Sequence, residues 1–439
     1  MNEFTPALVV AVIGGALALV QAARFARNAA ILLIASYMAH LLSALAQVRL
    51  TQDYYGIGDL LGYSRDGTLI GRALSFDFYR FAPELFHLAV GPRASFPSVS
   101  HWAGTTTGAM MALGGVLSYL TGGGPNTFCI CVAVWAYFGQ VALYRFFRNA
   151  LPEPFHERLL IAALLVPSCV FWASALLKES VAIGGMGFAV LGFANLRKAI
   201  RVGPAVQLLI GMATVGLVKP YILFALILGA GAWLYCDRVR GQVRLSTLVP
   251  VVLGAAVAVG GIALLTSVFP EFSIGSFAER AAAYQANTVA VEGGSNYAIG
   301  DTSQTTAAGQ LRYAPLAIVT ALFRPFLFEA ESPQMAVSAL ETGVLLVLTV
   351  RAMRRRSLLE TWRIVSHVPL LAFCLAFTLC LGFGVGLTTT NMGTLSRYRM
   401  PLIPFFTALV LVLDAPFFAR QPPAAAGQLV PAQLRRRPT

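Results

Sequence analysis

Long apolar runs alternate with short polar segments along the whole chain. Most runs are close to the roughly 17–21 residues that an α-helix needs to cross the hydrocarbon core of a bilayer. The runs lie at 6–22, 29–47, 126–144, 159–177, 180–196, 205–218, 221–236, 247–268, 334–350, 367–387 and 401–418. This pattern predicts an all-α, polytopic transmembrane helix bundle with about eleven spans.

Two further apolar runs are predicted to be re-entrant or interfacial helices. The run 102–121 is rich in glycine and threonine, and the run 312–328 is interrupted by Arg324-Pro325. Basic loops favour the inner side of a membrane. All basic loops fall on that side if neither run crosses, and 49–101 is then external. The alternative treats 102–121 as a true span and places 49–101 inside.

The composition argues against a separate soluble domain, because 57% of the residues are hydrophobic and only 12% are charged. We therefore predict one integral membrane domain, 1–439. It contains a first outer loop at 49–101, a second outer loop with the re-entrant helix at 269–333, and a cytoplasmic tail at 419–439. The net charge of +13 comes from basic residues in short loops. That distribution is typical of membrane orientation and does not indicate a nucleic-acid surface.

The cysteines and the N-terminus add little chemistry. The six cysteines lie mostly inside apolar runs, and no Cys/His set has metal-ligand spacing. They are predicted to be small buried residues. The first segment lacks the basic residue and cleavage site of a signal peptide, so 6–22 is predicted to be a retained helix.

Two acids follow the second predicted helix, in the segment Asp53-Tyr-Tyr-Gly-Ile-Gly-Asp59. A carboxylate just outside a helix end can bind a cation or act as a general base. Gly56 and Gly58 would allow a tight backbone turn there. The alternative is a solvated start of the loop.

Four polar segments interrupt the apolar pattern on the predicted outer side. Their polar residues are Lys178 and Glu179, Lys219, Arg324 and Glu329, and Asn391, Arg397 and Arg399. Cationic side chains, and arginine in particular, suit the oxygens of an anionic lipid phosphate or pyrophosphate. We predict that these residues bind such a substrate. The alternative is that the cations form structural ion pairs with Glu179, Glu329, Glu331 and Glu341.

These features resemble those of a known class of enzymes. The acid after an early helix, the long first outer loop and the outer arginines are similar to the GT-C class of polyprenyl-phosphate-dependent glycosyltransferases and to polymerases of bacterial surface polysaccharides. The segments PSCVFWASALLKES, VKPY, FRPFLFEA and NMGTLSRYRMPLIP resemble membrane proteins of exopolysaccharide gene clusters. The resemblance implies Asp53, or alternatively Asp59, as general base or metal-linked acid, and the cations as ligands of the departing phosphate.

The expected function is a membrane glycosyltransferase or polysaccharide polymerase of the bacterial inner membrane. It would take sugar from an undecaprenyl phosphate or pyrophosphate donor at the outer face and transfer it to a glycan or lipid acceptor. No nucleotide-binding motif is present. No cofactor is predicted, although a divalent metal is left open. The alternatives are a transporter or flippase of a lipid-linked saccharide and a non-catalytic membrane scaffold.

Overall fold

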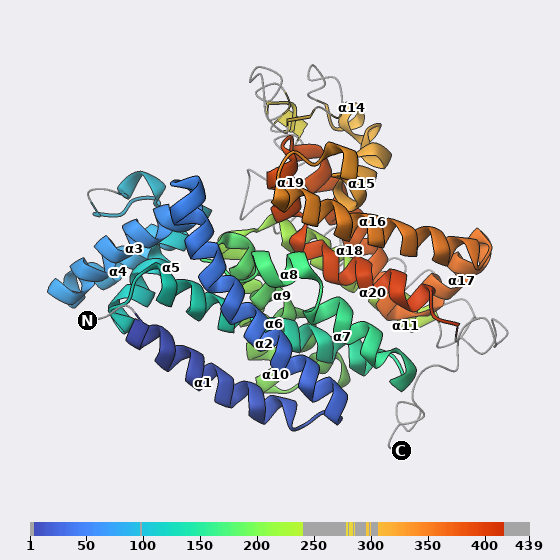
Figure 1. Cartoon of the computed structure of the whole chain (residues 1–439), viewed down its shortest axis with the longest axis horizontal. Helices are drawn as coiled ribbons and strands as arrows, with labels where there is room; N and C mark the ends of the chain where they lie inside the picture. Colours follow the sequence, from blue (N-terminus) through green and yellow to red (C-terminus); the bar gives the residue numbers. More distant parts are fainter. Residues whose placement is uncertain are drawn as a thin grey trace. The chain divides into compact units, whose positions relative to one another are not determined.

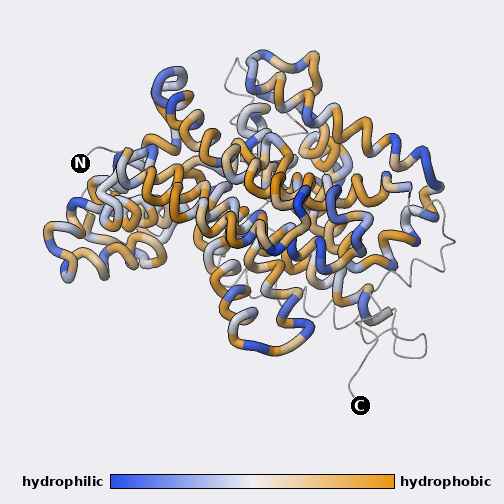
Figure 2. The backbone as a smooth tube through the Cα atoms, turned by 60° about the horizontal axis from the view of Figure 1, so that its bottom comes forward, coloured by the Kyte–Doolittle hydropathy of each residue, from blue (hydrophilic) through white to orange (hydrophobic). Residues whose placement is uncertain are grey.

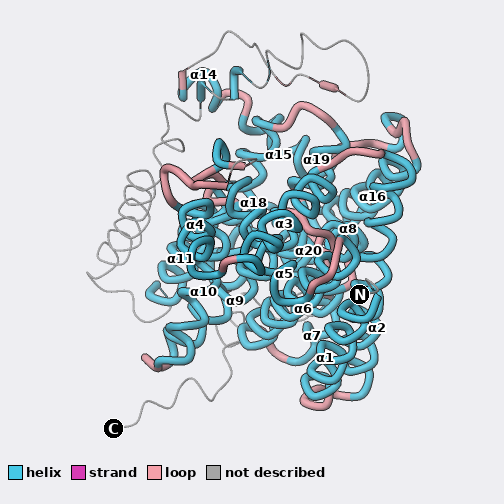
Figure 3. Tube along the Cα trace, turned by 90° about the vertical axis from the view of Figure 1, so that its left-hand side faces the viewer, coloured by secondary structure: helices cyan, strands magenta, loops and turns pink. Residues whose placement is uncertain are grey.

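The protein is helical throughout the part that the structure describes. The computed structural model describes residues 4–96, 99–239 and 306–416, with a few residues between 278 and 299. Helices fill most of these ranges (Figure 3), no strand occurs in them, and Asn296 and Asn391 form an isolated antiparallel bridge. The predicted all-α class is confirmed. The predicted span 247–268, the tail 419–439 and most of 269–305 in the second outer loop lie outside the described residues.

Seven helical segments within these ranges are long and apolar enough to cross a membrane. They are α1 (Phe4–Ala22), α2 (Arg27–Arg49) with the π-helical turn Leu50–Tyr55, α6 (Pro125–Ala150), α9 (Lys178–Lys198), α16 (Pro333–Arg354), α18 (Pro369–Thr388), and α19 (Met392–Tyr398) with α20 (Ile403–Leu413). Three further apolar helices are not among these seven, namely α10 (Val202–Val218), α11 (Tyr221–Val239) and α15 (Ala314–Phe323). The chain is therefore a membrane protein.

Three predicted segments differ in detail from the helices observed. The run 159–177 is divided into α7 (His156–Leu164) and α8 (Pro167–Trp172), and Pro167 explains why the helix cannot continue through this point. The Gly- and Thr-rich run 102–121 contains the 16-residue α5 (Thr106–Thr121), which is not among the seven. The first outer loop is largely helical, in α3 (Asp59–Phe76) and α4 (Phe78–Val90).

The described chain forms two compact units, and the first comprises residues 1–146 and 169–220. In it α1 packs on α2, α3 packs on α4 and α5, and α9 packs on α10 (Figure 1). Small residues bring helix backbones into contact: a Cβ added at Gly187 of α9 would lie 1.7 Å from the carbonyl oxygen of Gly139 in α6. Such close approach is typical of helix packing in lipid, where van der Waals contact replaces the hydrophobic effect.

The second unit comprises residues 147–168 and 221 onward. Its central helix α18 packs against α11, α15 and α20, and α20 also packs against α7. An aromatic cluster joins α18 to α20, where the rings of Phe377 and Phe405 have centroids 4.3 Å apart and Phe373 stacks on Phe377. These buried rings fill the centre of the unit.

Large apolar side chains also cover the outer faces of several spanning helices. Leu8 and Val12 of α1 and Val344 and Val347 of α16 are all exposed. Figure 2 shows hydrophobic residues along the helices and hydrophilic residues mainly at their ends. Exposed apolar surface of this length on spanning helices is suited to contact with lipid acyl chains.

Candidate functional site

The two predicted acids flank a sharp turn in the first unit. Asp53 lies in the π-helical turn that ends α2, Asp59 is the first residue of α3, and both are exposed. Between them Gly56 and Gly58 have φ values of 69° and 150°, a region that glycine adopts without steric cost. The glycines therefore set the direction in which α3 leaves α2.

A groove of about 620 Å³ lies beside this turn. One wall is the turn itself, with Gly56, Ile57 and Gly58. The other wall comes mainly from α3 and includes Leu61, Gly62, Ser64, Arg65, Thr68, Leu69 and Arg72, and Pro125 completes the lining. Leu61, Arg65, Thr68 and Arg72 recur at helical spacing, so they share one face of α3.

The lining combines positive charge with apolar surface. Arg65 donates from Nε to Oδ1 of the buried Asp66 at 2.9 Å, and this hydrogen bond raises the pKa of Arg65. Arg72 is exposed one full heptad further along α3. Ile57 and Leu69 add exposed apolar surface. A phosphate joined to an apolar chain would match both parts of this lining.

Lys178, Glu179 and Lys219 form contacts within the first unit. Nζ of Lys219 lies 2.7 Å from Oε1 of Glu179, and the two side chains are 5% and 0% exposed. Nζ of Lys178 donates to the hydroxyls of Thr106 and Thr107 at 2.8 and 3.0 Å. The pair of Lys219 and Glu179 corresponds to the structural alternative, in which the acids neutralise the cations.

The helix α8 ends before Lys178, and side chains from three other helices bind the carbonyl oxygens of its last residues. Gln140 of α6 donates to the carbonyl oxygen of Cys169, and Gln47 of α2 donates to that of Phe171, both at 3.1 Å. The hydroxyl of Ser180 donates to the carbonyl of Trp172 at 2.8 Å. Unsatisfied carbonyls are costly where water is excluded. These side chains therefore stabilise the interruption.

In the second unit, Arg399 is buried and joins three segments. Its guanidinium donates to the carbonyl oxygen of Arg324 and to Oγ of Ser338, the latter at 2.6 Å. Oγ of Ser338 lies 2.9 Å from Oγ of Ser396 in α19. Glu341, a proposed partner for the cations, accepts hydrogen bonds from the amide and hydroxyl of Ser168. Arg399 thus holds α16 and the end of α15 together.

Arg324 forms the ion pair that the structural alternative predicts. Its Nε lies 2.9 Å from Oε1 of Glu329, and the amide of Phe326 donates to the other carboxylate oxygen at 2.8 Å. Burial opposes ionisation of Glu329, but these hydrogen bonds outweigh it and lower its pKa. The guanidinium of Arg324 also lies 4.7 Å from the ring centre of Tyr297, a cation–π contact, and burial raises the pKa of Tyr297.

Asn391 caps α19 and contacts a segment far away in the sequence. Its Oδ1 accepts from the amide of Thr394 at 3.1 Å, and its Nδ2 donates to Oδ1 of Asn296 at 3.0 Å. The amide of Tyr297 donates to the carbonyl of Thr390 at 2.8 Å. Arg397 is half-buried, with its guanidinium 5.7 Å from the ring centre of Tyr398.

The predicted site residues are therefore divided between the units. Asp53, Asp59, Lys178, Glu179 and Lys219 belong to the first. The second brings Arg324, Glu329, Asn391 and Arg399 together around Tyr297 and holds Arg397. Within the described ranges, no group of three His, Cys, Asp or Glu side chains is placed to hold a metal ion.

Arg65 and Arg72 were not among the predicted site residues. Their separation by seven positions, which places them on one face of a helix, is the signal in the sequence that identifies them. The prediction of 49–101 as an outer loop gives no reason to place these two arginines on a shared helix face.

No protein-family model, curated protein or solved structure matches the chain.

Proposed function

We propose that this chain is a membrane glycosyltransferase or polysaccharide polymerase of GT-C type. It takes sugar from an undecaprenyl phosphate or pyrophosphate donor at the outer face of the bacterial inner membrane. The observation that carries the proposal is the groove on α3, whose one wall is the turn between Asp53 and Asp59 and whose other wall presents Arg65 and Arg72.

The donor phosphate binds to the arginines, and the first part of its lipid chain lies along Ile57, Leu61 and Leu69. Charge-assisted hydrogen bonds from guanidinium groups favour a phosphate over neutral ligands. The lining residues thus suit the amphiphilic character of a lipid-linked sugar.

The reaction needs one base and one stabilised leaving group. Asp53, or alternatively Asp59, removes the proton from an acceptor hydroxyl, whose oxygen attacks the anomeric carbon of the donor. The bond between that carbon and the phosphate oxygen breaks, and its electron pair leaves with the phosphate. Arg65 and Arg72 stabilise the charge that develops there. The donor supplies the free energy, so no nucleotide is required.

The test uses the full chain in lipid nanodiscs with a panel of undecaprenyl-linked mono- and disaccharides. Release of the lipid phosphate and formation of glycan are followed by mass spectrometry. Loss of a general base lowers turnover by about 10²–10⁴-fold, so we expect that loss for Asp53→Asn. Arg72→Gln should lower turnover by at least about tenfold by removing one charge-assisted contact. Arg201→Gln, which changes an exposed arginine outside the groove, is the matched control.

The assignment of the acid is decided by comparing Asp53→Asn with Asp59→Asn. Wild-type turnover in Asp53→Asn, together with loss of turnover in Asp59→Asn, would identify Asp59 as the general base. Wild-type turnover in both variants, and in Arg72→Gln, would contradict an active site at this groove.

A transporter or flippase of a lipid-linked saccharide is the second candidate, and one observation favours it. The buried pair of Glu179 and Lys219 lies next to the interruption between α8 and α9. Discontinuous helices and buried ionisable residues are found at substrate sites of transporters. A fluorescent lipid-linked sugar in liposomes distinguishes the two functions: a transporter moves it between leaflets unchanged, whereas an enzyme cleaves it.

A further inference from the structure

Arginines surround a single buried carboxylate at the end of α16. Asp414, which follows α20, is 1% exposed and pairs with Arg351, with Arg355 at 3.4 Å and with Arg158 at 3.8 Å. Burial opposes ionisation of Asp414, but the hydrogen bond and charge of Arg351 outweigh it and lower its pKa. One negative charge thus faces three positive ones, and Arg354 is exposed beside them.

These arginines also terminate α20. Arg158 donates to the carbonyl of Leu411 at 3.2 Å, and Arg356 donates to the carbonyls of Leu413 and Ala415. The C-terminal end of a helix carries partial negative charge and unsatisfied carbonyls, both of which favour cations. The cluster is therefore held rigidly to the helix end, and its surplus positive charge is fixed in place.

The next helix, α17 (Leu358–His367), has the character of an interfacial helix. A capping box between Ser357 and Glu360 begins it, and one face is buried through Ile364 and Val365. The remaining surface of the helix exposes Leu358 and Trp362, at 70% and 61%, together with Leu359 and the adjacent Arg363. Exposed Leu and Trp side chains flanked by a cation are typical of helices that lie in the plane of a membrane surface.

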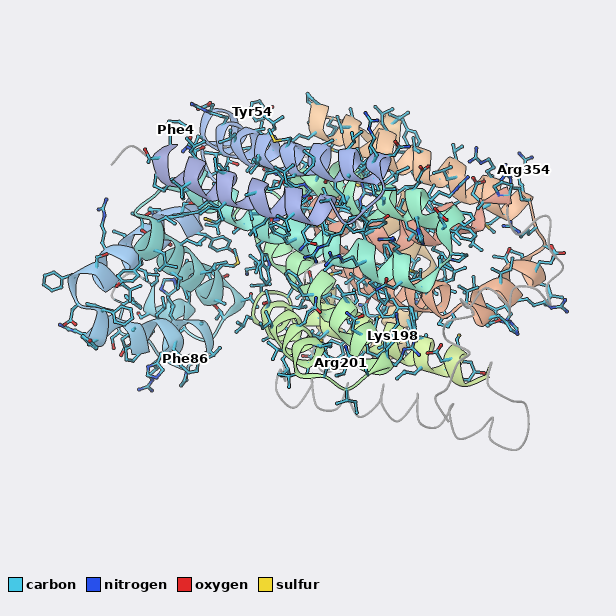
Figure 4. The ribbon with its side chains drawn as sticks, turned by 90° about the horizontal axis from the view of Figure 1, so that it is seen from below. Phe4, Tyr54, Phe86, Lys198, Arg201 and Arg354 are labelled. Atoms are coloured by element: carbon cyan, nitrogen blue, oxygen red, sulfur yellow. The ribbon has the colours of Figure 1, made fainter. Side chains whose placement is uncertain are left out.

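The position of α17 in the chain fixes its depth. It has ten residues and connects α16 to α18, both of which are long and apolar enough to cross a membrane. Ten residues span only about half of the hydrocarbon core. The helix therefore lies where α16 leaves the bilayer, shortly after Arg354, which Figure 4 labels on the last turn of α16.

We propose that the exposed face of α17 and the end of α16 form a binding surface for anionic phospholipids. Leu358, Leu359 and Trp362 enter the boundary between headgroups and acyl chains, and Arg354 and Arg363 contact lipid phosphates. The surplus of arginine over Asp414 selects anionic over zwitterionic headgroups. This surface is independent of the sugar-transfer reaction.

The test measures which lipid lies next to Trp362 in bilayers of phosphatidylglycerol and phosphatidylcholine. One of the two lipids carries brominated chains, which quench nearby tryptophan. The fluorescence of a Trp362→Phe variant is subtracted to isolate the Trp362 signal. Brominated phosphatidylglycerol should quench Trp362 more strongly than brominated phosphatidylcholine at equal molar fraction. The preference should decrease as salt rises.

Substitutions of the arginines test the source of the selectivity. An arginine near an anionic surface changes lipid affinity by about fivefold at low salt. Arg354→Gln and Arg363→Gln should each lower the preference by about that factor, whereas the exposed Arg201 offers a matched control that should leave it unchanged. Equal quenching by both lipids, or a preference that survives the double variant, would overturn the proposal. So would quenching of Trp362 by iodide alone, because the face would then be in water.

Discussion

The buried pair of Glu179 and Lys219 should stabilise the first unit as an ion pair. The side chains are 0% and 5% exposed and lie 2.7 Å apart. Removing one partner of such a pair leaves an uncompensated charge in a dry environment and costs about 3–5 kcal/mol. We therefore expect Lys219→Met and Glu179→Leu each to destabilise the unit by about that amount.

The double variant distinguishes the energy of the ion pair from the separate contributions of the two side chains. Replacing both charges by apolar side chains of similar volume removes the uncompensated charge and is often neutral. Lys219→Met combined with Glu179→Leu should therefore regain most of the stability lost in either single variant. The non-additivity measures the coupling between the two side chains.

Thermal unfolding can be followed with a thiol-reactive fluorescent dye. Cys129 and Cys169 are free thiols buried in the first unit, so they become reactive when it unfolds. For a unit of this size a loss of 3–5 kcal/mol lowers the midpoint by on the order of 10 °C. Arg201→Met, which removes an exposed charge, should leave the midpoint within about 2 °C of wild type.

Two results would refute this reasoning. If both single variants unfolded within about 2 °C of wild type, the pair would be hydrated and not buried. If the double variant were as unstable as the sum of the singles, the charges would not be coupled. Either result would increase the support for a ligand-binding role of Lys219 and thus for the transporter.

Other predictions concern packing and pH. Gly187→Ala should lower the free energy of unfolding by about 1–3 kcal/mol, because its Cβ would lie 1.7 Å from the carbonyl oxygen of Gly139. Gly62→Ala is the control: no atom lies within 4 Å of the added Cβ, so this variant should be neutral or stabilising in the same thermal assay. Because hydrogen bonds from Arg324 and Phe326 lower the pKa of Glu329, its contribution to stability should be complete above the pKa of an unfolded glutamate and lost as pH falls through the lower folded value. Glu329→Gln should remove that acid-sensitive part of the unfolding curve, and an unchanged pH profile would contradict the assignment.

The spanning helices follow from the sequence because apolar length is a local property. The helices α2, α6 and α18 each cover a run that the hydropathy pattern defines. The interruption between α7 and α8 does not follow from that pattern, because 159–177 is apolar throughout. It depends on Pro167. The end of α8 depends in addition on the amide side chains of Gln47 and Gln140, which lie on other helices and donate to the carbonyls of Phe171 and Cys169.

The candidate site is harder to predict from the sequence, because the sequence does not show which charged side chains form ion pairs. It identified Arg324 and Glu329 as polar interruptions, and the structure pairs them. It also selected Arg399 for phosphate binding, whereas the folded chain buries that guanidinium between the carbonyl of Arg324 and Ser338. Partner choice of this kind is set by helix packing, so hydropathy and spacing cannot supply it.

The difference between paired and accessible cations decides where a phosphate can bind. A lipid-linked donor must approach from the bilayer or from water, so its phosphate ligands have to be exposed before it arrives. Lys219 and Arg324 face Glu179 and Glu329, and displacing those acids would cost the donor the energy of an existing ion pair. Arg72 is exposed and lines a groove that already has volume for a ligand, and Arg65 of the same groove keeps a side chain that is 77% exposed although it pairs with Asp66. If the enzyme proposal holds, Arg72→Gln should therefore weaken donor binding without lowering the unfolding midpoint. Arg324→Gln should lower the unfolding midpoint and leave donor binding unchanged.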